Sequence, residues 1–158
     1  MTVPDAELRR RLERFAETCR RTGLKLTHQR SEVFRELAMT DEHPDAETVY
    51  DRVRRRLPTV SRDTVYRTLA TLDAAGLVRR TAVLVGAGRY DANTDPHHHF
   101  VCTRCGRVQD FNSPALDGLP IPPSVKALGA IESAHVQVRG VCAACAGRGN
   151  GPKRRRKA

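Results

Sequence analysis

The stretch His97-His98-His99-Phe100-Val101-Cys102-Thr103-Arg104-Cys105 decides how the second half of this chain folds. It ends in a Cys-x-x-Cys pair, and a second pair, Cys142 and Cys145, follows after 36 intervening residues. Each pair places two thiolates on one tight turn, and two such turns together supply the four sulfurs of a tetrahedral structural zinc site. We therefore predict structural zinc on Cys102, Cys105, Cys142 and Cys145, with disulfides or idle thiols as the alternative.

The histidine triplet that precedes the first cysteine pair offers a different kind of ligand. A four-sulfur site does not need imidazole nitrogen, and nitrogen ligands suit a different range of metals from thiolates. The histidines are therefore available for a second metal.

The composition favours small subdomains over one large core. The chain has 158 residues, of which 39% are hydrophobic and none is tryptophan. Subdomains of this kind need support from a metal or from a partner subunit. No apolar stretch approaches the roughly 20 residues of a membrane span, and residues 5–14 are too charged for a signal peptide. We expect a cytoplasmic chain with reduced thiols and no membrane partner.

The charge is concentrated at the two ends of the chain. Residues 1–90 carry 18 Lys and Arg against 13 Asp and Glu, residues 91–147 carry 4 against 5, and residues 148–158 carry six basic side chains and no acid. A basic half beside a neutral one suggests a polyanionic partner, although a solvated charged surface would look similar. Residues 148–158 are expected to form a disordered basic tail.

Four helices with short turns are predicted before residue 77. Apolar residues recur at helical spacing in four segments, and Gly23 is suited to end the first helix. Thr27, Asp45 and Ser61 are suited to cap the second, third and fourth helices. Cys19 lies on the apolar face of the first helix and is expected to be a core residue.

A β-hairpin is predicted to follow, with strands at Leu77–Val85 and Gly88–Asp91. Helices followed by a hairpin are the order of a winged helix-turn-helix, in which the last helix enters the DNA major groove. In that helix a buried stripe of Val65, Leu69 and Leu72 would turn Tyr66 and Arg67 outward.

The second half is predicted to form a small sheet stapled by zinc. Short strands are expected at Phe100–Thr103, Arg107–Phe111 and Val136–Val141, and only a short helical stretch near Val125–Leu128 lies between the last two. A sheet this small leaves an edge and a face unburied, so we expect this half to form a dimer.

Several short motifs resemble one known family, in the order and at the spacing that the family has. They are Thr27–Arg30, His43–Ala46, Ser61–Leu69, Gly88–Asp91, His97–Cys105 and Asp110–Phe111. Over about residues 8–146 the chain resembles the ferric uptake regulator (Fur) family of bacterial metal-dependent repressors.

The resemblance implies an α+β homodimer in the bacterial cytoplasm that binds palindromic operator DNA. Residues 1–91 would be a winged helix-turn-helix domain with a hinge, and residues 92–147 a small α/β dimerisation domain stapled by the four-cysteine zinc site. Residues 148–158 would be the tail.

The resemblance also assigns functional residues by position. A regulatory Fe2+ or Mn2+ at the hinge would be held by His43, Asp91, His97, His99 and Asp110. The DNA-reading positions are Arg62, Thr64, Tyr66 and Arg67.

Asp110 stands where the peroxide-sensing (PerR) branch has aspartate and classical iron sensors usually have glutamate. In that branch peroxide reacts at bound iron and oxidises a ligand histidine, here His43 or His97, and the operator is released. The alternative is an iron- or other metal-supply sensor of the Fur or Zur kind, without peroxide chemistry.

A third metal site, present in some members, would use His98, Asp117 and His135. Pro96 stands where a histidine would be needed, so we expect this site to be incomplete. His135 is then an ordinary strand histidine, and His28 and His98 are surface groups or supports for a ligand.

Two other classes of protein fit the sequence less well. A zinc hydrolase or deaminase needs a glutamate base beside a metal histidine in motifs that this sequence does not have, so we predict no enzyme. A zinc-ribbon nucleic-acid-binding module would explain the cysteines and the tail. It would leave His43, Asp91 and Asp110 without a role.

Overall fold

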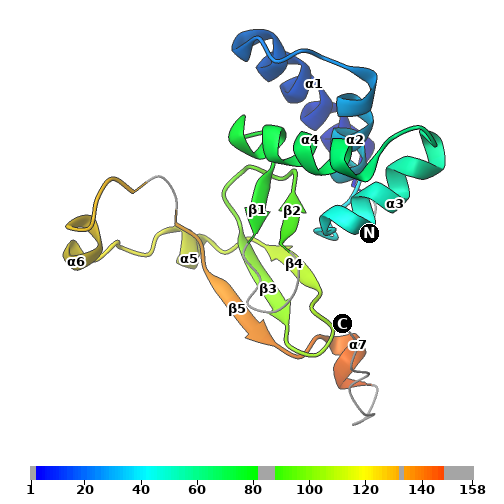
Figure 1. Ribbon diagram of the computed structural model, residues 1–158. Helices are drawn as coiled ribbons and strands as arrows, with labels where there is room; N and C mark the ends of the chain where they lie inside the picture. The colour runs from blue at the N-terminus through cyan, green and yellow to red at the C-terminus, as the bar shows by residue number, and fades with distance from the viewer. Residues whose placement is uncertain (1–2, 82–87, 132–133, 148–158) are drawn as a thin grey trace. The chain divides into compact units, whose positions relative to one another are not determined.

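The computed structural model describes residues 3–81, 88–131 and 134–147, and the chain divides into two compact units at residue 95 (Figure 1). The first unit, residues 1–95, is helical with a small hairpin. Its elements are α1 (Asp5–Thr22), α2 (His28–Ala38), α3 (Ala46–Arg56), α4 (Arg62–Ala74), β1 (Arg79–Thr81) and β2 (Arg89–Asp91).

The predicted helix boundaries are confirmed by their caps. The side chains of Thr27, Asp45 and Ser61 each accept a hydrogen bond from the backbone N–H three residues further on, at the start of α2, α3 and α4. Gly23 ends α1 with a φ of 68°, a left-handed conformation that glycine adopts at little cost.

The core of the first unit is a continuous apolar cluster that all four helices share. Phe15 of α1 stacks on Phe34 of α2 at 4.5 Å between ring centroids, and Cys19 is buried beside them, as expected. Val65, Leu69 and Leu72 of α4 are fully buried, which confirms the predicted stripe.

The first strand of the hairpin begins two residues later than predicted. β1 pairs antiparallel with β2, with Arg79 opposite Asp91, but Leu77 and Val78 precede the strand and are buried in the helical core. The predicted part of the first strand beyond Thr81 lies outside the described residues.

The second unit contains a sheet of three strands in the order β4-β3-β5. Its strands are β3 (His98–Cys102), β4 (Val108–Phe111) and β5 (Gln137–Gly140), and helix α7 (Ala143–Ala146) follows. β3 pairs antiparallel with β4 and parallel with β5. The three predicted strands are present, but β3 begins two residues earlier than predicted and includes His98 and His99.

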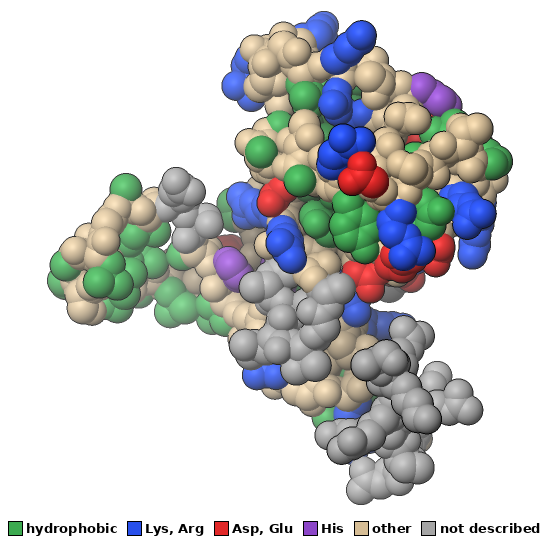
Figure 2. All heavy atoms as spheres, viewed as in Figure 1, with side chains coloured by type: hydrophobic (Ala, Val, Ile, Leu, Met, Phe, Trp, Pro, Cys, Tyr) green, Lys and Arg blue, Asp and Glu red, His purple; other side chains and the backbone are tan. Residues whose placement is uncertain are grey.

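The segment between β4 and β5 differs from the prediction. It contains two one-turn helices. Helix α5 (Pro114–Asp117) was not predicted, and α6 (Pro123–Lys126) begins two residues before the predicted stretch and overlaps it. A proline in the first turn of each fits a helix start, where no backbone N–H is needed. The segment extends away from the β3–β4–β5 sheet, and its apolar side chains gather on the surface (Figures 1 and 2).

Among the described helices, none is both long and apolar enough to cross a membrane.

Candidate metal centres

The four cysteines of the two Cys-x-x-Cys pairs form one cluster in the second unit. A sulfur from each lies within 4.8 Å of the others, and the sulfurs of Cys105 and Cys142 are 3.8 Å apart. Cys102 is the last residue of β3 and Cys105 lies on the turn that leads to β4, while Cys142 caps the start of α7 and Cys145 lies within it. All five cysteines of the chain are free thiols, so the disulfide alternative is not supported.

The protonation of this cluster suits a divalent cation. Burial raises the pKa of the Cys102 thiol, but hydrogen bonds from the backbone N–H groups of Cys142, Cys105 and Arg104 outweigh burial and lower that pKa to about 6. Hydrogen bonds with neighbouring thiols raise the pKa of Cys145 to about 12. The Cys102 thiol therefore ionises more readily than a free thiol, and the thiolate is the form that binds a metal. Four sulfurs on two turns match the donors of structural zinc.

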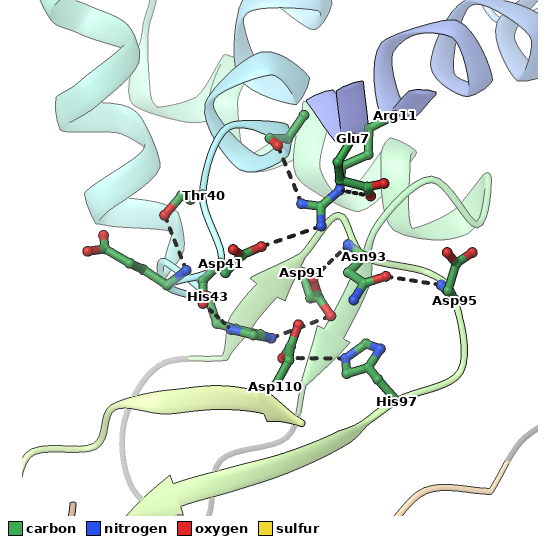
Figure 3. Close-up of polar contacts among 12 residues, drawn as sticks. Glu7, Arg11, Thr40, Asp41, His43, Asp91, Asn93, Asp95, His97 and Asp110 are labelled. Carbon is green, nitrogen blue, oxygen red and sulfur yellow. Dashed lines mark hydrogen bonds and ion pairs between the residues drawn. The ribbon is translucent and has the colours of Figure 1, made fainter. Parts of the chain in front are cut away.

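The predicted regulatory ligands divide between the two units. In the first unit, His43 lies on the loop between α2 and α3, and Asp91 is the last residue of β2. His43 Nε2 lies 3.4 Å from Asp91 Oδ2, and both side chains are buried (Figure 3). At this distance one imidazole nitrogen and one carboxylate oxygen could bind the same metal ion.

The loop that carries His43 is tied to the strand that carries Asp91. The Arg89 guanidinium donates to the carbonyl oxygen of His43 at 3.1 Å, and the Tyr90 N–H donates to the carbonyl oxygen of Pro44 at 3.0 Å. His43 has a φ of 50°, in the left-handed region that non-glycine residues rarely adopt. Neighbouring contacts hold that conformation, which is common at functional sites.

In the second unit, His97, His99 and Asp110 converge. The Nε2 atoms of His97 and His99 are 2.8 Å apart, and Asp110 Oδ1 lies 3.5 Å from the first and 3.6 Å from the second. The pairing of β3 with β4 places His99 opposite Asp110, which explains the contact. Two ring nitrogens this close cannot both carry protons. Two nitrogens and a carboxylate oxygen suit Fe(II), Mn(II), Zn(II) or Co(II).

The third candidate site is not assembled within the described residues. His98 Nε2 pairs with Asp117 Oδ1 at 3.0 Å, and the Val136 N–H donates to His98 Nδ1 at 3.1 Å. His135 lies beside His99 instead, with 5.7 Å between ring centroids. His98 is buried, which excludes the surface alternative for this residue and leaves that of a support for a ligand, whereas His28 is exposed.

The predicted DNA-reading side chains lie on α4. Arg62, Tyr66 and Arg67 are exposed and Thr64 is half-buried. Arg62 pairs with Glu47 and Arg67 pairs with Asp63, both at 2.8 Å. These are exposed ion pairs of little stability, so DNA phosphates could replace the carboxylates at low cost.

Sequence reasoning missed two groups that support the first-unit ligands. The Asn93 N–H donates to Asp91 Oδ1 at 2.7 Å. No pattern in the sequence predicted this contact. Arg11 of α1 reaches the loop before His43. Its signal was available, because Arg11 stands at helical spacing between Leu8 and Phe15, where a core residue is expected.

The model of the ferric uptake regulator family matches residues 21–126, more than half of the chain. Peroxide-responsive repressor PerR of Staphylococcus epidermidis is 29% identical over 141 residues, which cover 88% of this chain and 93% of that protein. The crystal structure of the Campylobacter jejuni peroxide stress regulator is 29% identical with a TM-score of 0.66, covering 82% of this chain and 98% of that one. A zinc uptake regulator solved with zinc and DNA is 26% identical with a TM-score of 0.64, covering 89% and 96%. The elements and these likenesses confirm the predicted fold class, a winged helix-turn-helix domain followed by a small α/β domain with a four-cysteine cluster.

Proposed function

Because the chain belongs to the ferric uptake regulator family, we propose that it is a homodimeric, metal-dependent repressor that binds operator DNA when its regulatory site is filled. The observation that carries this proposal is a second set of ligands, nitrogen and oxygen, beyond the four cysteines. A chain that needed only structural zinc would have no use for it. A repressor name and a complex with DNA among the similar proteins support the same function.

The proposed switch uses ligands from both units. His43 and Asp91 belong to the DNA-binding half, residues 1–91 with its hinge, and His97, His99 and Asp110 belong to the dimerisation half, residues 92–147. A metal that needs both sets stabilises the one arrangement in which they meet, by its greater affinity for that arrangement. In that arrangement the two α4 helices of a dimer would be held at the spacing of operator half-sites.

The two metals would have separate roles. Zinc on the four cysteines would hold the second unit folded, since four protein ligands leave no open position for chemistry. Fe2+ or Mn2+ on the nitrogen and oxygen ligands would be the regulated ion, because that donor set is harder and exchanges more readily than thiolates.

Asp110 and the PerR relatives favour peroxide as the signal. Iron bound at this site would supply the redox activity that activates hydrogen peroxide. One oxygen atom would be added to the ring of His43 or His97, the other would leave as water, and the ring would lose two electrons to the peroxide. The oxidised ring binds metal poorly, so the DNA-binding arrangement would be lost.

A metal-supply sensor is the second candidate, because a zinc uptake regulator is nearly as similar to this chain. A peptide mass map separates the two candidates. Protein loaded with Fe2+ without oxygen receives a small excess of peroxide, and Mn2+-loaded protein is the control. Peroxide sensing predicts one added oxygen on the peptide with His43 or His97 in the iron sample alone. Unmodified histidines at full iron occupancy would leave the metal-supply function.

DNA binding is tested with a duplex selected from random sequence by the Mn2+-loaded protein. We expect fluorescence anisotropy to show binding that a chelator reverses. Arg67→Ala should weaken binding by about 5- to 150-fold, since a base contact of Arg contributes about 1–3 kcal/mol. Arg9→Ala removes the same charge from the exposed surface of α1 and should change the affinity little. Equal losses in the two variants would argue for non-specific charge attraction.

A further inference from the structure

We infer that Arg11 is a positioning residue for the metal ligand His43, acting through Asp41, and this inference rests on the proposed regulatory site. Arg11 lies on α1, 32 positions before His43 in the chain. No motif of the family resemblance includes it.

The Arg11 guanidinium is buried and makes three directed contacts. Only 8% of the residue is exposed. Nε donates to Glu7 Oε1 at 2.7 Å, Nη1 to the carbonyl oxygen of Ala38 at 3.4 Å, and Nη2 to Asp41 Oδ1 at 3.4 Å (Figure 3). Burial of a charge is costly unless it is paired and hydrogen-bonded. Arg11 therefore binds the end of α2 and the loop after it to α1.

Asp41 passes this constraint to His43. His43 Nδ1 lies 3.2 Å from the carbonyl oxygen of Asp41. A carbonyl oxygen can only accept, so Nδ1 is the donor in this contact. That leaves Nε2, the atom that faces Asp91 Oδ2, as the nitrogen that would bind a metal. A proton held on Nδ1 is what a metal at Nε2 requires of the ring.

The backbone of His43 makes this support necessary. Its φ of 50° lies in the left-handed region, a conformation that is unfavourable for a residue other than glycine. On the C-terminal side of this strained residue, Arg89 holds the loop by its hydrogen bond to the carbonyl oxygen of His43. On the N-terminal side, Arg11 holds the loop by its hydrogen bond to the carboxylate of Asp41. Without Arg11 the Asp41 carbonyl could move away and the ring could turn or change tautomer.

The test compares Arg11→Gln, Asp41→Asn and Arg11→Lys with Arg9→Gln in the full-length, zinc-loaded protein. Arg9 is exposed on the same helix and has no side-chain ion pair with the described residues. Mn2+ affinity is measured by calorimetry, and the His43 tautomer by 15N NMR of the metal-free protein. Loss of a hydrogen-bonding partner behind a metal ligand costs about 10–100-fold in affinity, and we expect that loss for Arg11→Gln.

Asp41→Asn should also weaken Mn2+ binding. Arg11 loses its charged partner in this variant, while the backbone carbonyl that contacts His43 is still present. Arg11→Lys should recover part of the affinity, since it keeps the charge but not the three-way geometry. Arg9→Gln should bind as the unaltered protein does. The Nδ1–H signal of His43 should weaken in Arg11→Gln and Asp41→Asn alone.

Wild-type Mn2+ affinity and an unchanged tautomer in Arg11→Gln would overturn the inference. So would a loss of thermal stability in that variant without a loss of affinity in Asp41→Asn, because Arg11 would then be structural only. If Arg11→Gln does not fold, Asp41→Asn decides the question by the same two measurements. Absence of a second metal equivalent in the unaltered protein would instead contradict the proposed function.

Discussion

The two units of the chain are stabilised by different physical means. The first buries a continuous apolar cluster from four helices, while the buried apolar side chains described in the second unit are Val101, Cys102, Val108 and Cys142. Two of those four are cysteines of the metal cluster. The first unit can therefore fold by burial of apolar surface, whereas the second buries so little that we expect it to need a metal on its cysteines.

The magnitudes agree with this division. Structural zinc contributes on the order of 10 kcal/mol to a small fold, which is comparable to the whole stability of a typical domain. The segment between β4 and β5 adds little, because Leu119, Val125, Leu128 and Ile131 are exposed. We attribute that exposure to surface that a second copy of the chain would cover in the proposed dimer.

The largest effect is expected from Cys102→Ser. Loss of one of four thiolates should release zinc and remove hydrogen-exchange protection from β3, β4 and β5, while the helices of the first unit keep theirs. Zinc analysis and hydrogen-exchange mass spectrometry measure both effects. Cys19→Ala, which removes a buried thiol outside the cluster, should keep its zinc. A protected sheet in zinc-free Cys102→Ser would remove the contrast between the units.

Leu69→Ala should do the reverse. It leaves a cavity in the core of the first unit and should lower its free energy of unfolding by about 2–5 kcal/mol, with zinc content unchanged. Leu26→Ala is the control, since Leu26 is 56% exposed in the first unit and should change stability by under about 0.5 kcal/mol. Chemical denaturation followed by circular dichroism checks both. A loss of zinc in Leu69→Ala would mean that the units do not fold independently.

The smallest effect is a pH dependence confined to the first unit. The hydrogen bond from Arg10, with a further one from Arg11, lowers the pKa of Glu7. A lowered folded-state pKa gives stability that is present above the unfolded pKa, near 4.5, and is lost as the pH falls below it. Glu7→Gln should therefore flatten the acid side of the stability profile by up to about 1 kcal/mol.

Thermal unfolding between pH 3 and 6 measures this. Glu13→Gln removes an exposed carboxylate from the same helix and should leave the profile of the unaltered protein. Equal flattening in the two variants would show a general charge effect and not the Glu7 contacts.

What the sequence predicted well are features of local chemistry. Thr27, Asp45 and Ser61 cap helices because a short polar side chain can reach the backbone three residues on, wherever the helix packs. Apolar periodicity predicted the buried stripe of α4, because helix geometry alone decides which residues share one face. The cysteine spacing predicted a cluster that the structure contains.

What the sequence missed depends on contacts between distant segments or on weak local signals. Leu77 and Val78 look like strand residues but are taken into the helical core. Helix α5 was not predicted because its proline suggests a break in a helix, although proline is favourable in the first turn. Helical spacing could have marked Arg11 as buried, but its partner Asp41 stands 30 positions away, so no local pattern could reveal that contact.

The regulatory residues, the DNA-reading residues and the domain boundary at residue 91 remain predictions. They come from the family resemblance, and geometry within each unit is compatible with them. Within the first unit the contact of His43 with Asp91, and within the second the contact of His99 with Asp110, support the predicted ligand set.

A titration of Mn2+ into the zinc-loaded protein tests the central claim most directly. The unaltered chain and His28→Ala, which removes an exposed histidine, should bind one Mn2+ per chain beyond zinc. His43→Ala and His99→Ala, one from each unit, should each weaken that same equivalent at least tenfold while zinc content stays unchanged. Wild-type affinity in His43→Ala would contradict the account, because the metal would then be held by the second unit alone and could not control the DNA-binding half.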